Sequence, residues 1–469
     1  MAGGRTCADR ARCWRARCGR CSAPGRRSAT GGGAVADSQP PQRLRRELGV
    51  TGAVVMGLGS IVGTGVFVSI GIATAVAGAW VIAAIAVAAA IAACNALSSA
   101  QLAASHPVSG GTYEYGYRYL SPALGFTAGW MFLCAKTASA ATAALGFSGY
   151  LLHLVGSANE WQVPIAVLAV ALLTVLVISG LRRSNLMNAG IVAVTIGSLV
   201  VFILAGLPDA AREGAGNLAA AGRGEAAGDA AGFLEATALM FVAFAGYARV
   251  ATMGEEVRTP ERTIPRAILL LLIISAILYM AVAAVAVSAA GVAALTGATA
   301  RSGTPLEAAA RALTAPGIDI VVAIGAVTAT LGVLLNLILG LSRVVLAMGR
   351  RGDLPPLLAR LSPDARAPAA AVIAVGIAIG ALTATGSIET TWAFSAFSIL
   401  VYYGLTNLAA LRLPKAHRRY PRLVAWAGLA ACLFLAFWVP PPIWLAGLGL
   451  IGVGLAWHFA VPGLWRRSP

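Results

Sequence analysis

Charged residues are scarce in this chain. Asp, Glu, Lys and Arg make up 11% of its 469 residues, against roughly 25% in an ordinary soluble domain. Hydrophobic residues make up 58%, and the mean hydropathy is +0.80. A soluble core could not bury this much apolar surface. The shortage of charge therefore excludes an ordinary water-soluble globular protein and makes lipid the solvent for much of the chain.

The motifs of common enzymes are also missing. The sequence has no P-loop, no His-Glu-x-x-His and no Gly-x-Ser-x-Gly. Its histidines are scattered at loops or at the ends of apolar runs, and no pair has metal-ligand spacing: His106, His153, His417 and His458. We therefore expect no enzymatic activity, no ATPase within this chain, no metal and no other cofactor.

The first 47 residues contain no apolar stretch of the kind that a signal peptide needs. They are rich in Arg, Gly and Ser, and we interpret 1–47 as a disordered basic cytoplasmic tail or as an over-long start of the chain. Their Cys18–Cys21 pair has no second pair and no histidine nearby, so a zinc or redox site is not expected. The net charge of +17 comes from this tail and from short segments between apolar runs. That distribution argues against a nucleic-acid partner.

The remaining chain is divided into apolar runs of membrane-spanning length. About 20 residues cross the roughly 30 Å of a bilayer core, and we count about 12 such runs. They lie near 49–73, 78–104, 122–154, 162–181, 185–207, 233–256, 266–290, 317–348, 368–386, 390–411, 423–439 and 442–461. This pattern predicts an all-α membrane protein with about 12 transmembrane helices in one domain, 48–465. The stretches 208–232 and 291–316 are expected to be loops on the outer side.

The positions of the basic residues predict the orientation. After residue 42, most Arg and Lys fall in alternate connecting segments, and the other segments hold only Arg212, Arg223, Arg301 and Arg311. Because cytoplasmic loops carry the excess of positive charge, we expect both termini to be cytoplasmic, in an inner-membrane protein. Tryptophans near the predicted outer ends are interpreted as an aromatic belt: Trp80, Trp161, Trp392, Trp438 and Trp444.

The first apolar run contains closely spaced glycines, in the order Gly57-Leu-Gly59-Ser-Ile-Val-Gly63-Thr64-Gly65. Glycine inside a helix costs roughly 0.5–1 kcal/mol relative to alanine. So many glycines either break the helix or form a seam of small residues on which another helix packs. The sequence alone leaves both interpretations open.

The sixth run carries a second unusual segment. It reads Phe241-Val-Ala-Phe244-Ala245-Gly246-Tyr-Ala-Arg249, with a charged residue at membrane depth. Such features are costly unless they line a cavity. The first and sixth runs would correspond in two five-helix halves, and interruptions at matching places indicate a transporter's substrate site.

The chemistry of such breaks suits a zwitterion. A helix that begins near Gly63, Thr64 and Gly65 offers unpaired N–H groups and a positive dipole end, which suit a carboxylate. The carbonyls that end the preceding half-helices, near Ile61 and in Phe241–Phe244, suit an ammonium group. An α-amino acid has both groups only a few ångströms apart.

Several segments resemble those of the amino acid–polyamine–organocation permease superfamily. They are Gly59–Phe67 in the first run, Pro107–Tyr115 and Gly125–Trp130 around the second loop, Phe241–Pro265, and Ser342–Arg343 followed by Met348–Pro355. The resemblance covers about 42–465. It implies the five-plus-five inverted-repeat, LeuT-type fold, with repeat one at about 48–207, repeat two at about 233–411 and two extra helices at about 423–461.

The resemblance also implies site residues. Gly63, Thr64 and Gly65 would hold the substrate carboxylate. The carbonyls of Ile61, Phe241 and Phe244 would hold its amine. Phe244 would be an aromatic gate, and Ala245 and Gly246 would form the break in the sixth helix.

The position that would hold a proton-coupling lysine in some relatives is Thr195 here. Lys136, well inside the third run, is the alternative: it could gain and lose a proton during transport, or it could be a structural lysine with a snorkelling side chain. Arg249 could meet an acidic substrate, hold an inner gate or lie in the cytoplasmic vestibule, which we favour.

We therefore expect a secondary active transporter of amino acids that works by alternating access with protons as the coupling ion. The proposed pocket helices carry no carboxylate at mid-membrane depth, so neutral amino acids are favoured over cationic ones, and acidic ones could bind through Lys136 or Arg249. The alternatives are an amino acid exchanger, or a sensor or channel on the same scaffold. The sequence leaves the oligomeric state open.

Overall fold

The computed structural model describes residues 49–106, 110–180, 185–221, 228–251, 257, 259–360 and 368–460. The predicted tail, 1–47, lies outside the described residues. The helices of the first half are α1 Val50–Ile61, α2 Thr64–Phe67, α3 Ser69–Ala77, α4 Val81–Ser105, α5 Thr112–Tyr119, α6 Pro122–Val155, α7 Gln162–Ile178 and α8 Asn185–Ala221. Short 3-10 turns η1 Gly78–Trp80 and η2 Asn159–Trp161 precede α4 and α7.

The second half is also helical within the described residues. It contains α9 Ala230–Phe244, η4 Ala245–Tyr247, α10 Ala248–Ala251, α11 Pro260–Ser302, α12 Pro305–Arg311, α13 Ile318–Arg351, η5 Pro356–Ala359, α14 Ala369–Thr383, α15 Ile388–Leu411 and η6 Lys415–His417. Two further helices follow, α16 Arg422–Ala436 and α17 Pro441–Ala460.

Nine helical segments of the described chain are long and apolar enough to cross a membrane. They agree with the expectation of an all-α membrane protein. One of them, Thr64–Ser105, runs from the first expected span, which also contains the short apolar helix α1, into the second. The short apolar helices α14 and α16 lie within the expected spans 368–386 and 423–439. Against the prediction of about 12 spans, the described residues contain nine candidate segments, and three further apolar helices are shorter than a full span.

Two expected outer loops are in large part helical. The helix α8 continues past the predicted end of its span, through Pro208, to Ala221. The helix α11 continues to Ser302 with a kink at Gly291, where φ is +78°. Both predictions of a loop were wrong over these residues, because alanine-rich sequence favours helix even where its polarity ends the apolar run.

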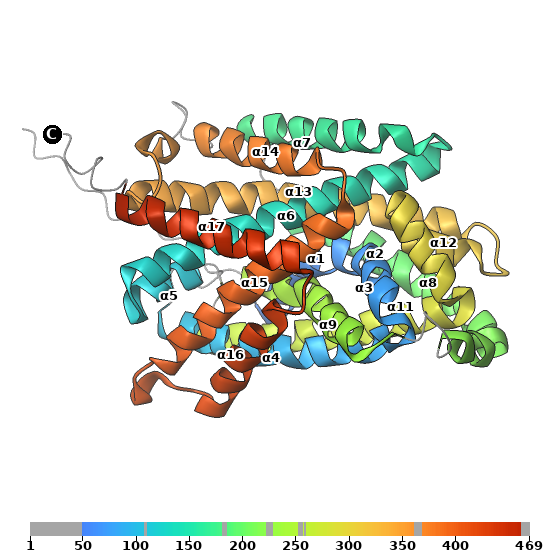
Figure 1. Ribbon diagram of the computed structural model, residues 1–469, viewed down its shortest axis with the longest axis horizontal. Coiled ribbons are helices and arrows are strands. Elements are labelled where there is room, and N and C mark those ends of the chain that lie inside the picture. The colour runs from blue at the N-terminus through green and yellow to red at the C-terminus, as the bar shows by residue number, and fades with distance from the viewer. Residues whose placement is uncertain are drawn as a thin grey trace, which may run out of the picture. The chain divides into compact units, whose positions relative to one another are not determined.

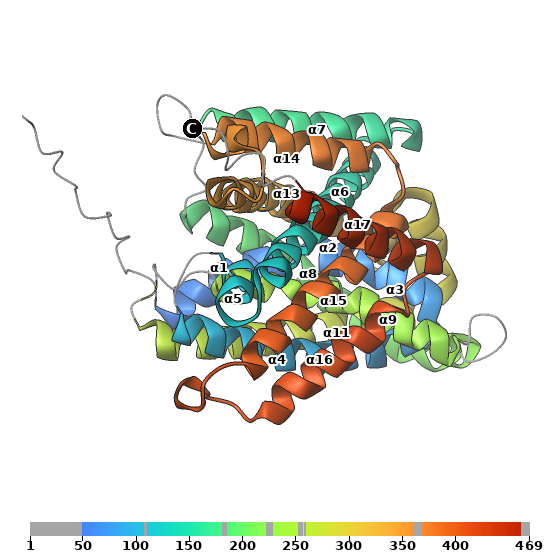
Figure 2. The same cartoon turned by 60° about the vertical axis from the view of Figure 1, so that its left-hand side comes forward.

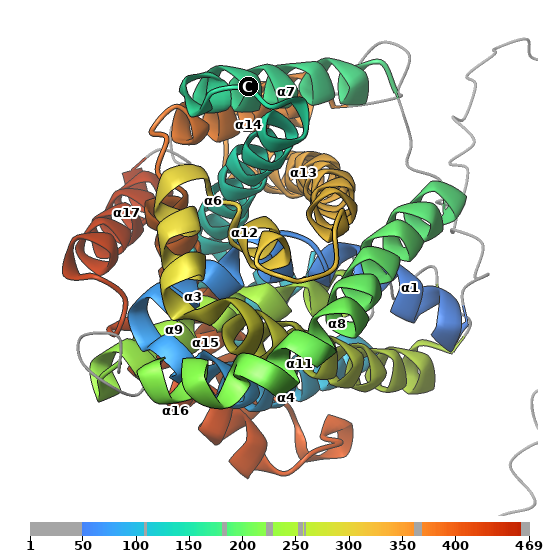
Figure 3. The same cartoon turned by 90° about the vertical axis from the view of Figure 1, so that its right-hand side faces the viewer.

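Long helices from the two halves pack directly on each other. The helix α6 contacts α13 and α15, and α7 lies beside α14 (Figures 1 and 2). On the other side of α1 and α2, α4 contacts α9 and α11, and α8 contacts both α11 and α13 (Figure 3). The segments α1, α2 and α9 are thus enclosed between two groups of longer helices.

Two motifs that are far apart in the sequence meet at the end of α13. The hydroxyl of Tyr113 donates to Asp353 Oδ2 at 2.5 Å, and that of Tyr117 donates to the same carboxylate at 2.8 Å. Beside them, Arg351 pairs with Glu114 at 2.5 Å. Burial and the hydrogen bond to Asp353 raise the pKa of Tyr113, so its hydroxyl stays a donor. These contacts fasten α5 to the segment that follows α13.

Candidate functional site

The first span is interrupted where its glycines are found. The helix α1 ends at Ile61, Val62 is extended with φ −80° and ψ 102°, and Gly63 precedes the next helix with φ −178° and ψ −119°. The N–H groups of Val66 and Phe67 both donate to the carbonyl of Gly63, which starts α2. The first N–H groups of α2 therefore have no partner within their own helix.

The sixth span tightens where Ala245 and Gly246 lie. The helix α9 ends at Phe244 and continues as the 3-10 turn η4 and the short helix α10. The N–H of Ala245 donates to the carbonyl of Val242, three residues back, and not to that of Phe241. Because a 3-10 turn shortens each hydrogen bond by one residue, the carbonyl of Phe241 loses its usual helical donor.

The two irregular segments touch each other through glycine. A Cβ placed on Gly246 would lie 2.3 Å from the carbonyl oxygen of Ser60 and 2.6 Å from Cγ1 of Ile61. A Cβ placed on Gly65 would lie 2.8 Å from that of Ala243. Both positions leave no space for a side chain, so the backbones approach each other directly. Glycine is needed here for close packing as well as for the change in direction.

A cavity of about 40 Å³ lies where these segments face α6, α13 and α15. Its lining residues come from both interruptions and from the helices that enclose them: Ser60, Ile61, Thr64, Gly65, Lys136, Ser139, Val242, Ala243, Gly246, Val333, Leu337 and Trp392. Residues of both predicted breaks, on α1 and α2 and on α9 and η4, thus line one small space in the interior.

Two polar side chains in this cavity lack the partners that buried groups usually have. The hydroxyl of Thr64, a residue only 3% exposed, makes no hydrogen bond. Lys136 is 9% exposed, and the structure gives it neither an ion pair nor a hydrogen bond within the described residues. Buried polar groups are nearly always hydrogen-bonded, so unpaired ones are expected where a ligand supplies the partner. The cavity combines a positive charge with a free hydroxyl.

The remaining predicted residues lie close to the cavity but do not line it. Phe241 and Phe244 are fully buried, and their rings pack on Tyr403 and Tyr279 respectively. Gly63 contacts the cavity residue Val333. Ala245 offers its carbonyl to the hydroxyl of Tyr403 at 3.1 Å.

The two other coupling candidates are outside the cavity lining. The hydroxyl of Thr195 donates to the carbonyl of Ile191 at 2.7 Å, one turn earlier in α8. Arg249 is half-buried in α10 and has interactions of its own. The residues 252–256 that follow α10 lie outside the described residues, so the predicted vestibule position of Arg249 stays a prediction. Of the three candidates, only Lys136 reaches the cavity.

Sequence reasoning found Lys136 on α6 but missed Ser139 on the same helix and the cavity residues contributed by α13 and α15. Ser139 follows Lys136 by three residues, so helical periodicity could have placed both on one face. The structure corrects the role of Trp392. We assigned it to an outer aromatic belt, yet it is 2% exposed, lines the cavity and donates its Nε1–H to the carbonyl of Leu239 at 3.0 Å. Apolar aromatic residues near a helix end look alike in sequence whether they face lipid or protein.

Comparison with known proteins gives relatives over most of the chain. It is 42% identical over 430 residues to an uncharacterised transporter of Mycobacterium tuberculosis, which covers 91% of this chain and 94% of the relative. It is 26% identical over 388 residues to the methylthioribose transporter of Bacillus subtilis, covering 77% and 81%. It is 27% identical over 428 residues to a branched-chain amino acid permease of the same organism, covering 86% and 90%.

The sequence profile of the amino acid permease family matches residues 52–466, which include every helix of the described fold except the first two residues of α1. This is a family of transporters and not of enzymes, and it implies the LeuT-type fold. The chain therefore belongs to the amino acid permease family, within the amino acid–polyamine–organocation superfamily, and is a multi-pass membrane protein.

Proposed function

We propose that this protein is a secondary active transporter that moves an amino acid across the cytoplasmic membrane by alternating access. The observation that supports this most is the cavity shared by both interrupted spans, with the unpartnered hydroxyl of Thr64 in its wall. A site between two corresponding irregular helices is typical of such carriers.

In the proposed complex, the substrate carboxylate binds the N–H groups of Gly63, Thr64 and Gly65 and accepts a hydrogen bond from the Thr64 hydroxyl. The ammonium group binds the carbonyls of Ile61, Phe241 and Phe244. The extended backbone at Gly63 and the 3-10 turn after Phe244 support this arrangement, because each removes helical partners from main-chain groups.

We propose neutral amino acids as the preferred substrates. Lys136 brings a positive charge to the cavity, and no Asp or Glu is among the described residues that line it. A cationic side chain would meet repulsion without a counter-charge, whereas an acidic side chain could pair with Lys136.

We further propose protons as the coupling ion and Lys136 as the group that carries the movable charge. It lies on α6, opposite the interrupted segments, and is the one coupling candidate that lines the cavity. The same role for Thr195 has no support, since its hydroxyl cannot carry a charge and is bonded within α8. Exchange of one amino acid for another on the same site is the alternative mechanism.

The proposed topology has both termini in the cytoplasm, with about 12 spans and two inverted repeats. Repeat one would cover about 48–207 and repeat two about 233–411. The packing of α7 beside α14 and of α6 on α13 supports this pairing, since these helices hold corresponding places in the two repeats.

Transport by the purified protein in proteoliposomes tests the proposal. We expect saturable counterflow of a labelled neutral amino acid, and accumulation when the outside is acidic. Thr64→Val keeps the shape of the side chain and removes its hydroxyl, so it should raise KM. The control Thr328→Val removes an exposed hydroxyl on α13 and should change nothing. Failure of all twenty amino acids to show counterflow would contradict the carrier. Uptake that requires an internal amino acid would favour exchange.

A further inference from the structure

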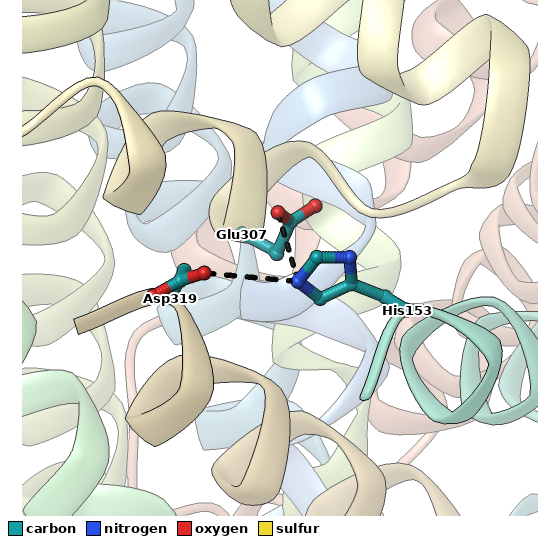
Figure 4. Close-up of side chains that lie close together, drawn as sticks. All are labelled: His153, Glu307 and Asp319. Carbon is teal, nitrogen blue, oxygen red and sulfur yellow. Dashed lines mark ion pairs between the residues drawn. The ribbon is translucent and has the colours of Figure 1, made fainter. Parts of the chain in front are cut away.

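A second polar cluster lies far from the central cavity, on the predicted outer side. Its side chains are His153 at the end of α6, Glu307 on α12 and Asp319 in the first turn of α13 (Figure 4). The Nε2 atom of His153 lies 3.1 Å from Glu307 Oε1 and 3.9 Å from Asp319 Oδ2. One donor atom of each residue lies within 4.8 Å of the others.

This spacing suits a small divalent transition-metal ion. Zinc binds histidine nitrogen and carboxylate oxygen at about 2.0–2.2 Å in tetrahedral geometry, which puts neighbouring donor atoms roughly 3.3–3.6 Å apart. The distance of 3.1 Å between His153 and Glu307 is slightly shorter, and the distance of 3.9 Å between His153 and Asp319 is slightly longer. Small side-chain rotations would therefore bring three ligands around one ion.

The surroundings of Glu307 also indicate a place for a cation. Its side chain is 6% exposed, and its Oε1 atom makes no hydrogen bond although Arg311 forms an ion pair with it. Its Oε2 atom accepts a hydrogen bond from Thr304 at 3.3 Å, which holds the carboxylate in orientation. A cavity of about 460 Å³, lined by His153 and Glu307 among others, leaves room for water at a fourth position.

At present the cation among these groups is Arg311. Its Nε atom pairs with Glu307 Oε1, and its Nη2 atom lies 2.7 Å from Nδ1 of His153. The same Nη2 atom lies 3.1 Å from Nε2 of His153, so the guanidinium, which can only donate, occupies the ring edge that a metal would need. The Arg311 side chain is 58% exposed, so it can turn out into water. When it does so, it leaves the ring nitrogens of His153 and Oε1 of Glu307 open to a metal ion.

We propose that His153, Glu307 and Asp319 bind one divalent transition-metal ion, with zinc as the best fit, in competition with Arg311. The sequence led us to expect no metal because no pair of histidines has metal-ligand spacing, whereas the fold brings one histidine to two carboxylates that are distant along the chain. The metal would join α6 of the first half to α12 and α13 of the second. A link of this kind would hold the outer ends of the two halves together. It would thereby stop the alternating motion, and this second effect rests on the proposed transport function.

Binding is tested on the purified full-length protein by calorimetry with zinc chloride, without reference to transport. We expect one saturable site per chain and a higher thermal midpoint. His153→Ala and Asp319→Asn should each weaken zinc binding by about tenfold or more. Arg311→Gln should strengthen it, because the competing cation is gone. His417→Ala, an exposed histidine on η6, is the matched control and should bind zinc as the wild type does.

Three results would overturn the proposal. The first is that neither the wild type nor Arg311→Gln binds zinc saturably. The second is that His153→Ala binds zinc as tightly as the wild type. The third is that Arg311→Gln binds zinc more weakly than the wild type. In proteoliposomes, zinc should inhibit uptake by the wild type and not by His153→Ala. Zinc binding without inhibition would keep the site and refute the arrest of transport. Absence of uptake in all variants, with zinc binding intact, would refute the transport function alone.

Discussion

The hydroxyl of Tyr279 donates to the backbone carbonyl of Ile61 at 2.7 Å, from α11 to the last residue of α1. Both residues are buried. A carbonyl at a helix end has no helical donor, and inside a membrane protein water cannot supply one. This tyrosine therefore allows α1 to end in the interior. The carbonyl keeps a second lone pair, which remains available to the proposed substrate ammonium.

Tyr279→Phe should destabilise the protein by about 1–3 kcal/mol, because it leaves a buried carbonyl without its donor. We also expect a higher KM for the substrate, since the end of α1 is held less firmly. Thermal unfolding in detergent and proteoliposome uptake measure the two effects. Tyr420→Phe, outside the membrane-spanning segments, is the control. A Tyr279→Phe protein as stable as the control would contradict this role of the hydroxyl.

Gly246→Ala should abolish transport while the protein still inserts and folds. The added methyl group would lie 2.3 Å from the Ser60 carbonyl oxygen, so the two interrupted segments would have to move apart. Gly380→Ala on α14 is the matched control, because nothing lies within 4 Å of its added Cβ. Alanine there should be neutral or slightly stabilising. Counterflow and thermal midpoints compare the two variants. Normal counterflow by Gly246→Ala would show that close contact is not required.

Lys136→Met should raise the thermal midpoint and uncouple transport from the pH gradient. An ammonium group buried without an ion pair costs folding free energy, which methionine avoids at similar length. Counterflow should persist, while accumulation driven by an inward proton gradient should be lost.

The control for Lys136 is Lys415→Met, which removes an exposed charge on η6. It should alter neither stability nor coupling. If Lys136→Met accumulates substrate with the pH dependence of the wild type, the lysine has a structural role only.

Asp353→Asn should cost more stability than the loss of an exposed ion pair. Asp353 is 4% exposed and accepts hydrogen bonds from Tyr113 and Tyr117. Weakening these charge-assisted bonds should cost about 1–3 kcal/mol. The comparison variant is Glu261→Gln, whose side chain is 70% exposed in its pair with Arg419. Its effect should stay within about 0.2–1 kcal/mol. Chemical unfolding measures both, and equal effects would contradict the ranking.

The glycine segment shows how far sequence alone could lead to the site. Closely spaced glycines in the first run predicted either a break or a packing seam, and in the structure the segment around Gly63 to Gly65 has both properties. The cavity residues Gly65 and Lys136 could be named from sequence because glycine and charge are unusual at membrane depth, Thr64 because it lies between two such glycines, and Gly246 from the family resemblance. Ser139, Val333 and Trp392 carry no such signal, since they are ordinary residues of apolar helices.

The sequence by itself determined that the chain is a helical membrane protein and where most of its helices lie. Those properties depend on local composition, because each apolar run must satisfy its own backbone hydrogen bonds in lipid. Tertiary structure alone decided which helix faces meet. It turned Trp392 inward, directed the hydroxyl of Tyr279 to Ile61, and brought His153 to Glu307 and Asp319. Such contacts join residues far apart along the chain, and they depend on packing that no local pattern encodes.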